Sequence, residues 1–222
     1  MRADRILRDA VSIGVATGLY AVSFGVLAVA AGCSVAQACV LSVVTFTGAS
    51  QLTFVSVVAA GGGAAAALPP AILLAGRNGV YGLSLDRVLR RGAWRRAAAA
   101  QLVIDESTAM AHAQAEPAAG RRAFFATGLS VFVFWNLGTL AGALAGQGLG
   151  DPRDLGLDAI FPAVFLALLA PQLRRPGAVP VALAGAAVAL ALVPLTPAGV
   201  PVTAAALVAL PALARRRRRA VA

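Results

Sequence analysis

Charged side chains inside apolar segments are the residues of this sequence best suited to chemistry. Arg77 lies within the apolar run 72–84, and Asp105 and Glu106 lie together within the run 102–110. A charge at the centre of a membrane segment costs about 2.5–3.5 kcal/mol on insertion scales, so such groups usually face the protein interior and serve a function. An arginine donates hydrogen bonds to anions, whereas a carboxylate binds an ammonium group or a proton. These three residues are therefore the first candidates for a binding site.

Each of these charges also has a structural interpretation. Arg77 could snorkel to the cytoplasmic interface about two turns away, although its polar neighbours Asn78 and Tyr81 favour a lined cavity. The two carboxylates could form an ion pair with Arg77 or with a loop arginine, instead of holding a proton or a substrate ammonium group. The sequence leaves both interpretations open.

A second polar run interrupts the apolar segment 35–60. Its polar or small members are Thr47, Gly48, Ser50 and Gln51. We predict a helix break near Gly48, because non-helical backbone at membrane depth is tolerated where protein or a water-filled cavity satisfies it. A break would offer backbone N–H groups to a ligand, with Ser50 and Gln51 as further partners.

For the other polar residues within apolar sequence, we predict mainly structural roles. Trp135 and Asn136 lie in the middle of the segment 124–146, where they pack or line a pathway. Asp158 follows a short loop and is expected to begin a helix, where a negative charge is favourable. His112, the single histidine, ends the acidic segment. A lone interfacial histidine is rarely a proton shuttle.

The motifs of enzymes and metal sites are not found in the sequence. The run 48–51 lacks the second glycine of a nucleophile elbow, and there is no phosphate-binding loop or metal-ligand spacing. Adjacent carboxylates such as Asp105 and Glu106 point about 100° apart on a helix. Cys33 and Cys39 are expected to be small buried residues. We therefore expect no enzymatic activity, cofactor or bound metal.

Composition predicts the class of the protein. Apolar residues make up 59% of the chain and charged residues only 13%, with a mean hydropathy of +0.82. A soluble domain normally carries about 25% charged residues. We predict an all-α integral membrane protein, built as a single transmembrane domain over residues 1–222. Residues 10–214 form its membrane core and residues 215–222 a basic cytoplasmic tail.

The net charge of +10 reflects topology rather than nucleic-acid binding. A nucleic-acid groove would need a soluble basic face. Most arginines instead lie between apolar runs, as cytoplasmic loops do under the positive-inside rule. They are Arg2, Arg5 and Arg8, those within 87–96, Arg121 and Arg122, Arg174 and Arg175, and those within 215–219. The pattern predicts a multi-pass protein of the cell membrane with both termini in the cytoplasm.

The number of membrane crossings has two solutions. Apolar runs of about 20 residues suit a spanning helix, and six candidates are 11–31, 68–85, 124–146, 155–173, 178–195 and 200–214. The segments 35–60 and 97–113 are less regular. If both are re-entrant, six crossings place every arginine cluster inside; if both cross, there are eight crossings and the 86–96 loop lies outside. We prefer the first solution because it obeys the charge rule throughout.

Six short motifs follow one another along the chain. They span residues 20–25, 41–51, 77–84, 104–107, 135–142 and 156–161. In order and spacing they resemble the AzlC family of branched-chain amino acid exporters, over residues of about 10 to 195. The family usually has an Asn before and a His after the arginine that matches Arg77. The chain has Ala75 and Asn78 there, which changes the polar groups beside Arg77.

The resemblance implies a secondary transporter subunit that exports branched-chain or other hydrophobic amino acids, coupled to an ion or proton. It also implies a small membrane partner of the AzlD type. In many transporters, half-helix N-termini point at a substrate carboxylate near the midplane. Two alternatives remain open, namely a non-transporting membrane scaffold and a transporter of an unrelated hydrophobic compound.

Overall fold

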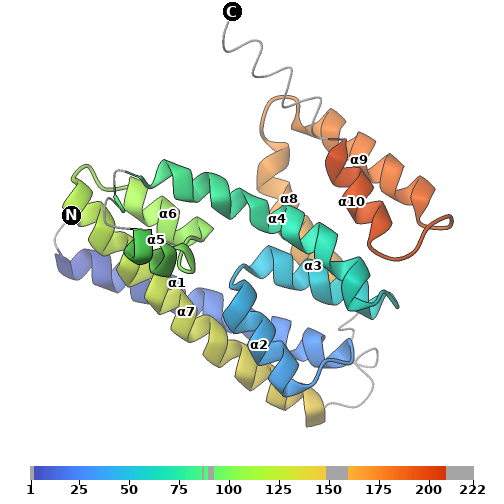
Figure 1. The fold of residues 1–222 in the computed structure, drawn as a ribbon, viewed down its shortest axis with the longest axis horizontal. Coiled ribbons are helices and arrows are strands. Elements are labelled where there is room, and N and C mark those ends of the chain that lie inside the picture. The colour runs from blue at the N-terminus through green and yellow to red at the C-terminus, as the bar shows by residue number, and fades with distance from the viewer. Residues whose placement is uncertain (1–2, 87, 90–92, 149–159, 209–222) are drawn as a thin grey trace, which may run out of the picture. The chain divides into compact units, whose positions relative to one another are not determined.

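The computed structural model describes residues 3–86, 88–89, 93–148 and 160–208 (Figure 1). Within these ranges the chain forms ten α-helices and no strand, which confirms the predicted all-α fold. The helices are α1 (Ala3–Ala30), α2 (Val35–Thr45), α3 (Gly48–Ala59), α4 (Ala64–Ser84), α5 (Ala93–Ala100), α6 (Asp105–His112), α7 (Pro117–Gly148), α8 (Ile160–Leu173), α9 (Ala178–Leu192) and α10 (Val200–Leu207).

The chain divides into two compact units. The first contains Met1–Leu52 and Leu74–Gly150, and the second contains Thr53–Leu73 and Asp151–Ala222. Because the boundaries fall within α3 and α4, each of these helices contributes to both units. All pairs of candidate site residues discussed below lie within the first unit. The prediction of one transmembrane domain over the whole chain stays a prediction.

Glycines set the turns of the second unit. Gly177 and Gly199 directly precede α9 and α10, with φ angles of +76° and +94°. L side chains rarely adopt this conformation, so glycine is required at both turns. Gly199 also lies against the backbone carbonyl of Ala66, where a Cβ atom would clash. The turn at Gly199 lets α9 and α10 pack together, with Gly185 beside Ala205.

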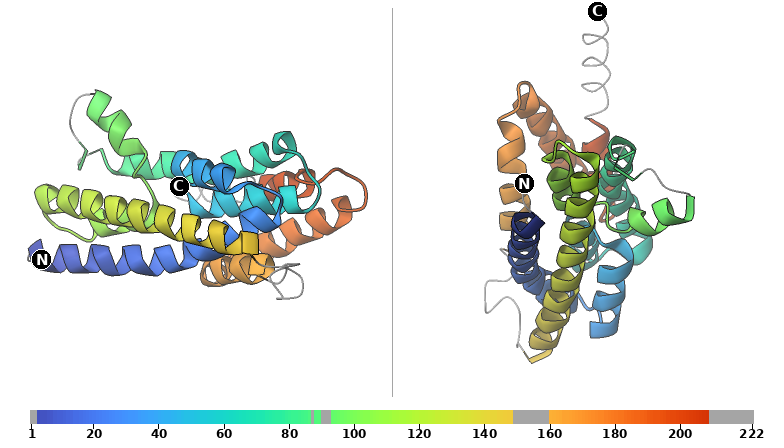
Figure 2. Two further views of the ribbon diagram at one scale, coloured as in Figure 1. Left: turned by 90° about the horizontal axis from the view of Figure 1, so that it is seen from below. Right: turned by 90° about the vertical axis from the view of Figure 1, so that its left-hand side faces the viewer.

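In the first unit, α1 and α7 run parallel along most of their lengths (Figure 2). Their register follows from the close contacts: Gly138 lies against Gly18, Gly142 against Val22, and Gly146 against Val26. The backbone carbonyls of α1 occupy the space that side chains on α7 would need. Small residues allow membrane helices to approach in this way, so van der Waals contacts between backbones hold the pair together.

The outward faces of α1 and α7 are apolar, while their inward faces carry small residues. Leu7, Val11, Val15 and Leu19 are exposed at one-turn intervals on α1. On α7 the exposed series is Phe125, Leu129, Val133, Leu137, Leu140 and Leu144. Large residues such as Phe24 and Phe124 are also buried, so both helices are apolar on their exposed and their buried faces. A surface helix of a soluble protein is polar on its exposed face, so these exposed apolar faces fit a surface that is covered by lipid.

Among the described residues, two helices are long and apolar enough to cross a membrane, by length and composition: α1 over Asp4–Ala30 and α7 over Pro117–Gly148. Helix α7 contains the predicted span 124–146, and α1 covers the predicted span 11–31 except its last residue. The predicted span 68–85 lies largely in α4, which continues through Pro69 and Pro70. The predicted span 178–195 matches the shorter apolar helix α9. The spans 155–173 and 200–214, together with Asp158, lie partly or wholly outside the described residues.

The two irregular segments are each broken into two helices. Within 35–60, α2 ends at Thr45 and α3 begins at Gly48, so the break lies next to the predicted glycine. Within 97–113, α5 ends at Ala100 and α6 begins at Asp105. The sequence predicted an irregular segment there, but not the position of this break. The carboxylates Asp105 and Glu106 begin a helix of their own.

The close packing of α1 on α7 predicts a sharp response to added side-chain volume. We expect Gly142→Ala to lower the free energy of unfolding by about 1–3 kcal/mol, because the new Cβ would collide with the Val22 carbonyl. Gly82→Ala in α4 is the control, since no atom lies within 4 Å of its Cβ position. Thermal unfolding in detergent measures both. Equal unfolding temperatures for the two variants would contradict the packing.

Candidate functional site

The break between α2 and α3 folds the chain back on itself. The side-chain amide of Gln51 donates from Nε2 to the carbonyl oxygen of Ser42 at 3.2 Å. In a continuous helix these residues would be about 13 Å apart along the axis, which is beyond the reach of a glutamine side chain. The start of α3 therefore lies beside the last turns of α2. Phe46, the residue after α2, has φ 14° and ψ 56° and begins this reversal.

Trp135 of α7 holds the break in place. Its indole Nε1 donates to Gln51 Oε1 at 3.0 Å, in a buried contact. The indole ring also lies against Gly48, where a Cβ atom would come within 2.8 Å of it. On its other sides the ring packs with Tyr20 and Phe24, at centroid distances of 5.7 and 6.4 Å. The polar groups of Gln51 and Trp135 are thus satisfied by hydrogen bonds to each other and to the α2 backbone.

A second buried contact joins α2 to α7. The hydroxyls of Ser42 and Thr139 lie 3.1 Å apart, and both residues are fully buried. Neither residue was predicted from the sequence. Serine and threonine are common in membrane helices, and the two positions are far apart in the chain, so no local pattern marks them as partners. Asn136, by contrast, donates from Nδ2 to the Phe132 carbonyl of its own helix at 2.8 Å.

The first turn of α3 retains polar groups that the helix does not use. The carbonyl of Thr47 accepts the first helical hydrogen bond, from Gln51 N at 3.1 Å. The Ser50 hydroxyl is fully buried and has no hydrogen-bond partner among the described residues. This turn could accept a ligand oxygen.

Ser107 sets the start of α6. Its Oγ accepts from Ile104 N at 3.2 Å and donates to Leu102 O at 2.6 Å, which stabilises the turn before the helix. Asp105 and Glu106 then occupy the first helical turn, where negative side chains are favoured by the helix dipole. The signal was present in the sequence, since two acidic residues followed by a serine are typical of a helix start.

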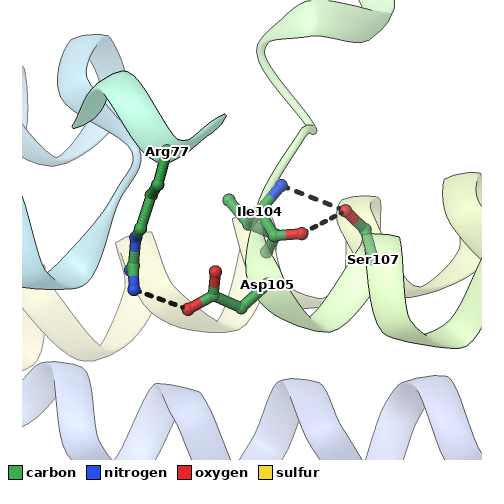
Figure 3. Close-up of polar contacts among 4 residues, drawn as sticks. All are labelled: Arg77, Ile104, Asp105 and Ser107. Atoms are coloured by element: carbon green, nitrogen blue, oxygen red, sulfur yellow. Dashed lines mark hydrogen bonds and ion pairs between the residues drawn. The ribbon is translucent and has the colours of Figure 1, made fainter. Parts of the chain in front are cut away.

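Arg77 and Asp105 form an ion pair between α4 and α6. Arg77 Nη1 lies 3.0 Å from Asp105 Oδ2, and Figure 3 shows the two side chains pointing toward each other. Both side chains are partly exposed, at 39% and 43%. The opposite sides of these groups are buried: Arg77 Nε, Asp105 Oδ1 and the nearby Asn78 Oδ1 lack hydrogen-bond partners within the described chain. Glu106 is half-buried in the same turn of α6.

A second contact between α4 and α6 lies about two turns further along both helices. The Ser84 hydroxyl and His112 Nε2 are 3.0 Å apart. The equal spacing on the two helices shows that the segment Leu74–Ser84 runs parallel to α6. Tyr81 lies between these contacts on α4 and is half-buried. His112, which the sequence analysis set aside, belongs to the same polar interface as Arg77 and Asp105.

The direction of α6 follows from its contacts with α7. Leu102, just before α6, lies against Gly128, whereas Ala111 near its end lies against Gly120. Therefore α6 runs antiparallel to α7, and so does the segment 74–84 of α4. The Arg77–Asp105 pair lies deeper along α7 than the Ser84–His112 contact does.

The two breaks are linked to each other. Gln101, in the connection between α5 and α6, donates from Nε2 to the carbonyl of Val43 at 2.6 Å. Val43 lies in the last turn of α2, whose final carbonyls have no helical partners. The structure therefore places both clusters of predicted residues around two neighbouring helix breaks. One cluster contains Thr47, Gly48, Ser50, Gln51 and Trp135, and the other contains Arg77, Asn78, Tyr81, Asp105 and Glu106. Asn136 follows Trp135 on α7, but its amide donates within its own helix.

Comparison with known proteins gives two matches. The family model described as AzlC protein matches residues 12–149. A curated protein of Helicobacter pylori (strain ATCC 700392 / 26695), described as an uncharacterized membrane protein, is 24% identical over 159 residues. The match covers 71% of this chain and 69% of that protein. No solved structure matches the chain.

The contact between Gln51 and Trp135 predicts a stability change. We expect Trp135→Phe to lower the free energy of unfolding by about 1–3 kcal/mol, because Gln51 Oε1 would remain buried without its donor. Trp94→Phe serves as the control, since Trp94 is 84% exposed. Thermal unfolding in detergent compares the two. Equal stability of both variants would show that the indole N–H does not hold the break.

Proposed function

We propose a membrane-transport function on the premise that this chain belongs to the AzlC family, whose model matches more than half of it. The chain is a membrane protein with an all-helical fold. Within that frame, we propose a secondary transporter subunit that exports branched-chain or other hydrophobic amino acids. A small AzlD-type membrane subunit is its expected partner.

The observation that carries this proposal is the Arg77–Asp105 ion pair beside two helix breaks. Charges inside membrane proteins usually mark substrate or ion pathways. Broken helices supply unpaired backbone groups at membrane depth, as substrate sites of transporters often do. Here the first turn of α3 offers the buried hydroxyl of Ser50, which has no partner among the described residues. Arg77 and Asp105 add one charge of each sign, which suits the two charges of an amino acid.

The arrangement of the first unit supports the topology with two re-entrant segments. Because α1 and α7 run parallel, their N-terminal arginines Arg5, Arg8 and Arg121 lie toward one end. Val88, within the arginine-rich loop 86–96, lies near Gly120 at the start of α7. All these arginines are then cytoplasmic under the positive-inside rule. The alternative with eight crossings would require the segment 74–84 to run parallel to α7.

Ion or proton coupling is assigned to Asp105 and Glu106, the two adjacent acidic residues at the start of α6. Glu106 lies next to Asp105 but points in another direction around α6, so one carboxylate can hold a substrate ammonium while the other carries a proton. The rival interpretation is a scaffold in which the charges only hold helices together. It leaves the unpartnered atoms around Ser50 and Asp105 without a role.

Transport in liposomes tests the proposal. Purified protein, reconstituted with and without its small partner, should exchange internal leucine for labelled external leucine. Asp105→Asn combined with Glu106→Gln should reduce this counterflow by at least about tenfold, because hydrogen bonds to a charged group are lost. Asp86→Asn is the control, since Asp86 lies outside the helices in an exposed ion pair with Arg96. Counterflow by the double variant at the wild-type rate would contradict the role of the two carboxylates.

A further inference from the structure

Helix α5 projects away from the rest of the first unit. It comprises the eight residues Ala93–Ala100, and Figure 2 shows it pointing sideways from the pair formed by α1 and α7. The chain on either side of it lies close to α7, because Val88 approaches Gly120 and Leu102 lies against Gly128. Those two glycines are about 12 Å apart along α7. The chain therefore leaves the bundle, forms α5 and returns beside the first half of α7.

The side of α5 that points away from the protein is apolar. Among its described side chains only Ala99 is buried, whereas Trp94 is 84% exposed. At about 100° per residue, Trp94, Ala97 and Ala98 share one face of the helix. Trp94 lies about 140° around the helix from Ala99, so this face is turned away from the protein. A surface helix in water carries polar residues on its exposed face instead.

Helix α5 is also too short to be stable on its own. Isolated helices of fewer than about 12–15 residues are marginal in water, and α5 has eight residues with one buried side chain among those described. Its length is far below the about 20 residues that a membrane crossing requires. A helix that neither packs in the bundle nor crosses the membrane needs another surface to stabilise it.

Positive charge accompanies the apolar face of α5. The segment 86–96 contains five arginines and one acidic residue, Asp86. Arg96 Nη2 lies 3.5 Å from Asp86 Oδ1, and both side chains are 52% exposed. An exposed ion pair of this kind contributes little to stability, so Arg96 can exchange this carboxylate for another anion. A guanidinium is well suited to phosphate, to which it donates two parallel hydrogen bonds.

We propose that α5 lies in the interfacial region of the membrane and binds the headgroups of acidic phospholipids. Trp94 occupies the boundary between headgroups and acyl chains, where tryptophan is enriched, and Arg96 binds a lipid phosphate. Arginines combined with a tryptophan face are typical of helices that lie along the membrane surface, with the apolar face buried by about 5–10 Å. The level of α5 fits this depth, because the first turns of the neighbouring α7 carry Arg121 and Arg122.

The anchored helix reaches the candidate site through one side chain. Gln101, directly after α5, donates from Nε2 to the carbonyl of Val43 in α2 at 2.6 Å. Helix α6 then begins at Asp105. An α5 that is held at the membrane surface therefore fixes the connection between the two helix breaks. This role needs only a membrane location, and it holds whether or not the chain transports amino acids.

Fluorescence quenching by brominated phospholipids locates Trp94. The purified chain is reconstituted in vesicles that contain phosphatidylcholine and phosphatidylglycerol in equal amounts, with bromine on the acyl chains of one lipid or of the other. The signal of Trp94 is the difference between the wild type and Trp94→Phe, because the second tryptophan, Trp135, is present in both. We expect both brominated lipids to quench Trp94, and brominated phosphatidylglycerol to quench it more strongly.

Removal of one charge should reduce this preference for acidic lipid. In Arg96→Gln the preference should fall by up to about fivefold, which is the contribution of one arginine near an acidic surface. High salt should lower the preference in the wild-type protein, because it screens exposed charges. Arg174→Gln is the matched control, since it removes one exposed arginine of the second unit and should keep the wild-type preference. If Arg96→Gln does not fold, the salt dependence of the wild type decides.

Three outcomes would overturn the inference. If neither lipid quenches Trp94, the residue lies in water, and a soluble partner rather than lipid is left to cover α5. Equal quenching by the two lipids would contradict the binding of acidic headgroups. An unchanged preference in Arg96→Gln, or in the wild type at high salt, would contradict the contact with phosphate. None of these results depends on leucine counterflow, so the proposed transport function is tested separately.

Discussion

The Arg77–Asp105 ion pair is the interaction on which the candidate site of the first unit depends. The two partly exposed groups lie among apolar helices, and each neutralises the other across 3.0 Å. For the ion pair to form, α4 and α6 must place Arg77 and Asp105 at the same level along the two helices. The chain achieves it by ending α5 and beginning α6 at Asp105, and by directing α4 alongside α6. The ion pair and the helix break are thus parts of one arrangement.

The close contact of α1 with α7 supports these breaks. Small residues bring the two backbones together, which leaves α7 free to hold α2 and α3 on another face. Trp135 fills the space beside Gly48 and satisfies Gln51, so the reversal after Phe46 has a fixed geometry. The backbone groups freed by the breaks are then partly used by side chains such as Gln51 and Gln101. The polar atoms that stay without a partner, the Ser50 hydroxyl together with Arg77 Nε and Asp105 Oδ1, are available to a ligand.

Local features of the sequence predicted much of this arrangement. Apolar length indicated α1 and α7, and the small polar run at 47–51 indicated the first break. The acidic pair with Ser107 also carried the signal for the start of α6, but the sequence analysis treated these carboxylates only as candidate charges within an irregular segment. Pairings between distant residues, such as Ser42 with Thr139 or Ser84 with His112, were not predictable. They depend on the register of packed helices, which one sequence does not encode locally.

The distance between the Arg77 guanidinium and the Asp105 carboxylate tests the central claim most directly. It can be measured by solid-state NMR on isotopically labelled protein in lipid bilayers, without and with saturating leucine. The account predicts that the two groups are in close contact in the empty protein, and that bound leucine places its ammonium group on Asp105 or Glu106 with its carboxylate within reach of Arg77. Bound leucine detected away from all three residues would contradict it.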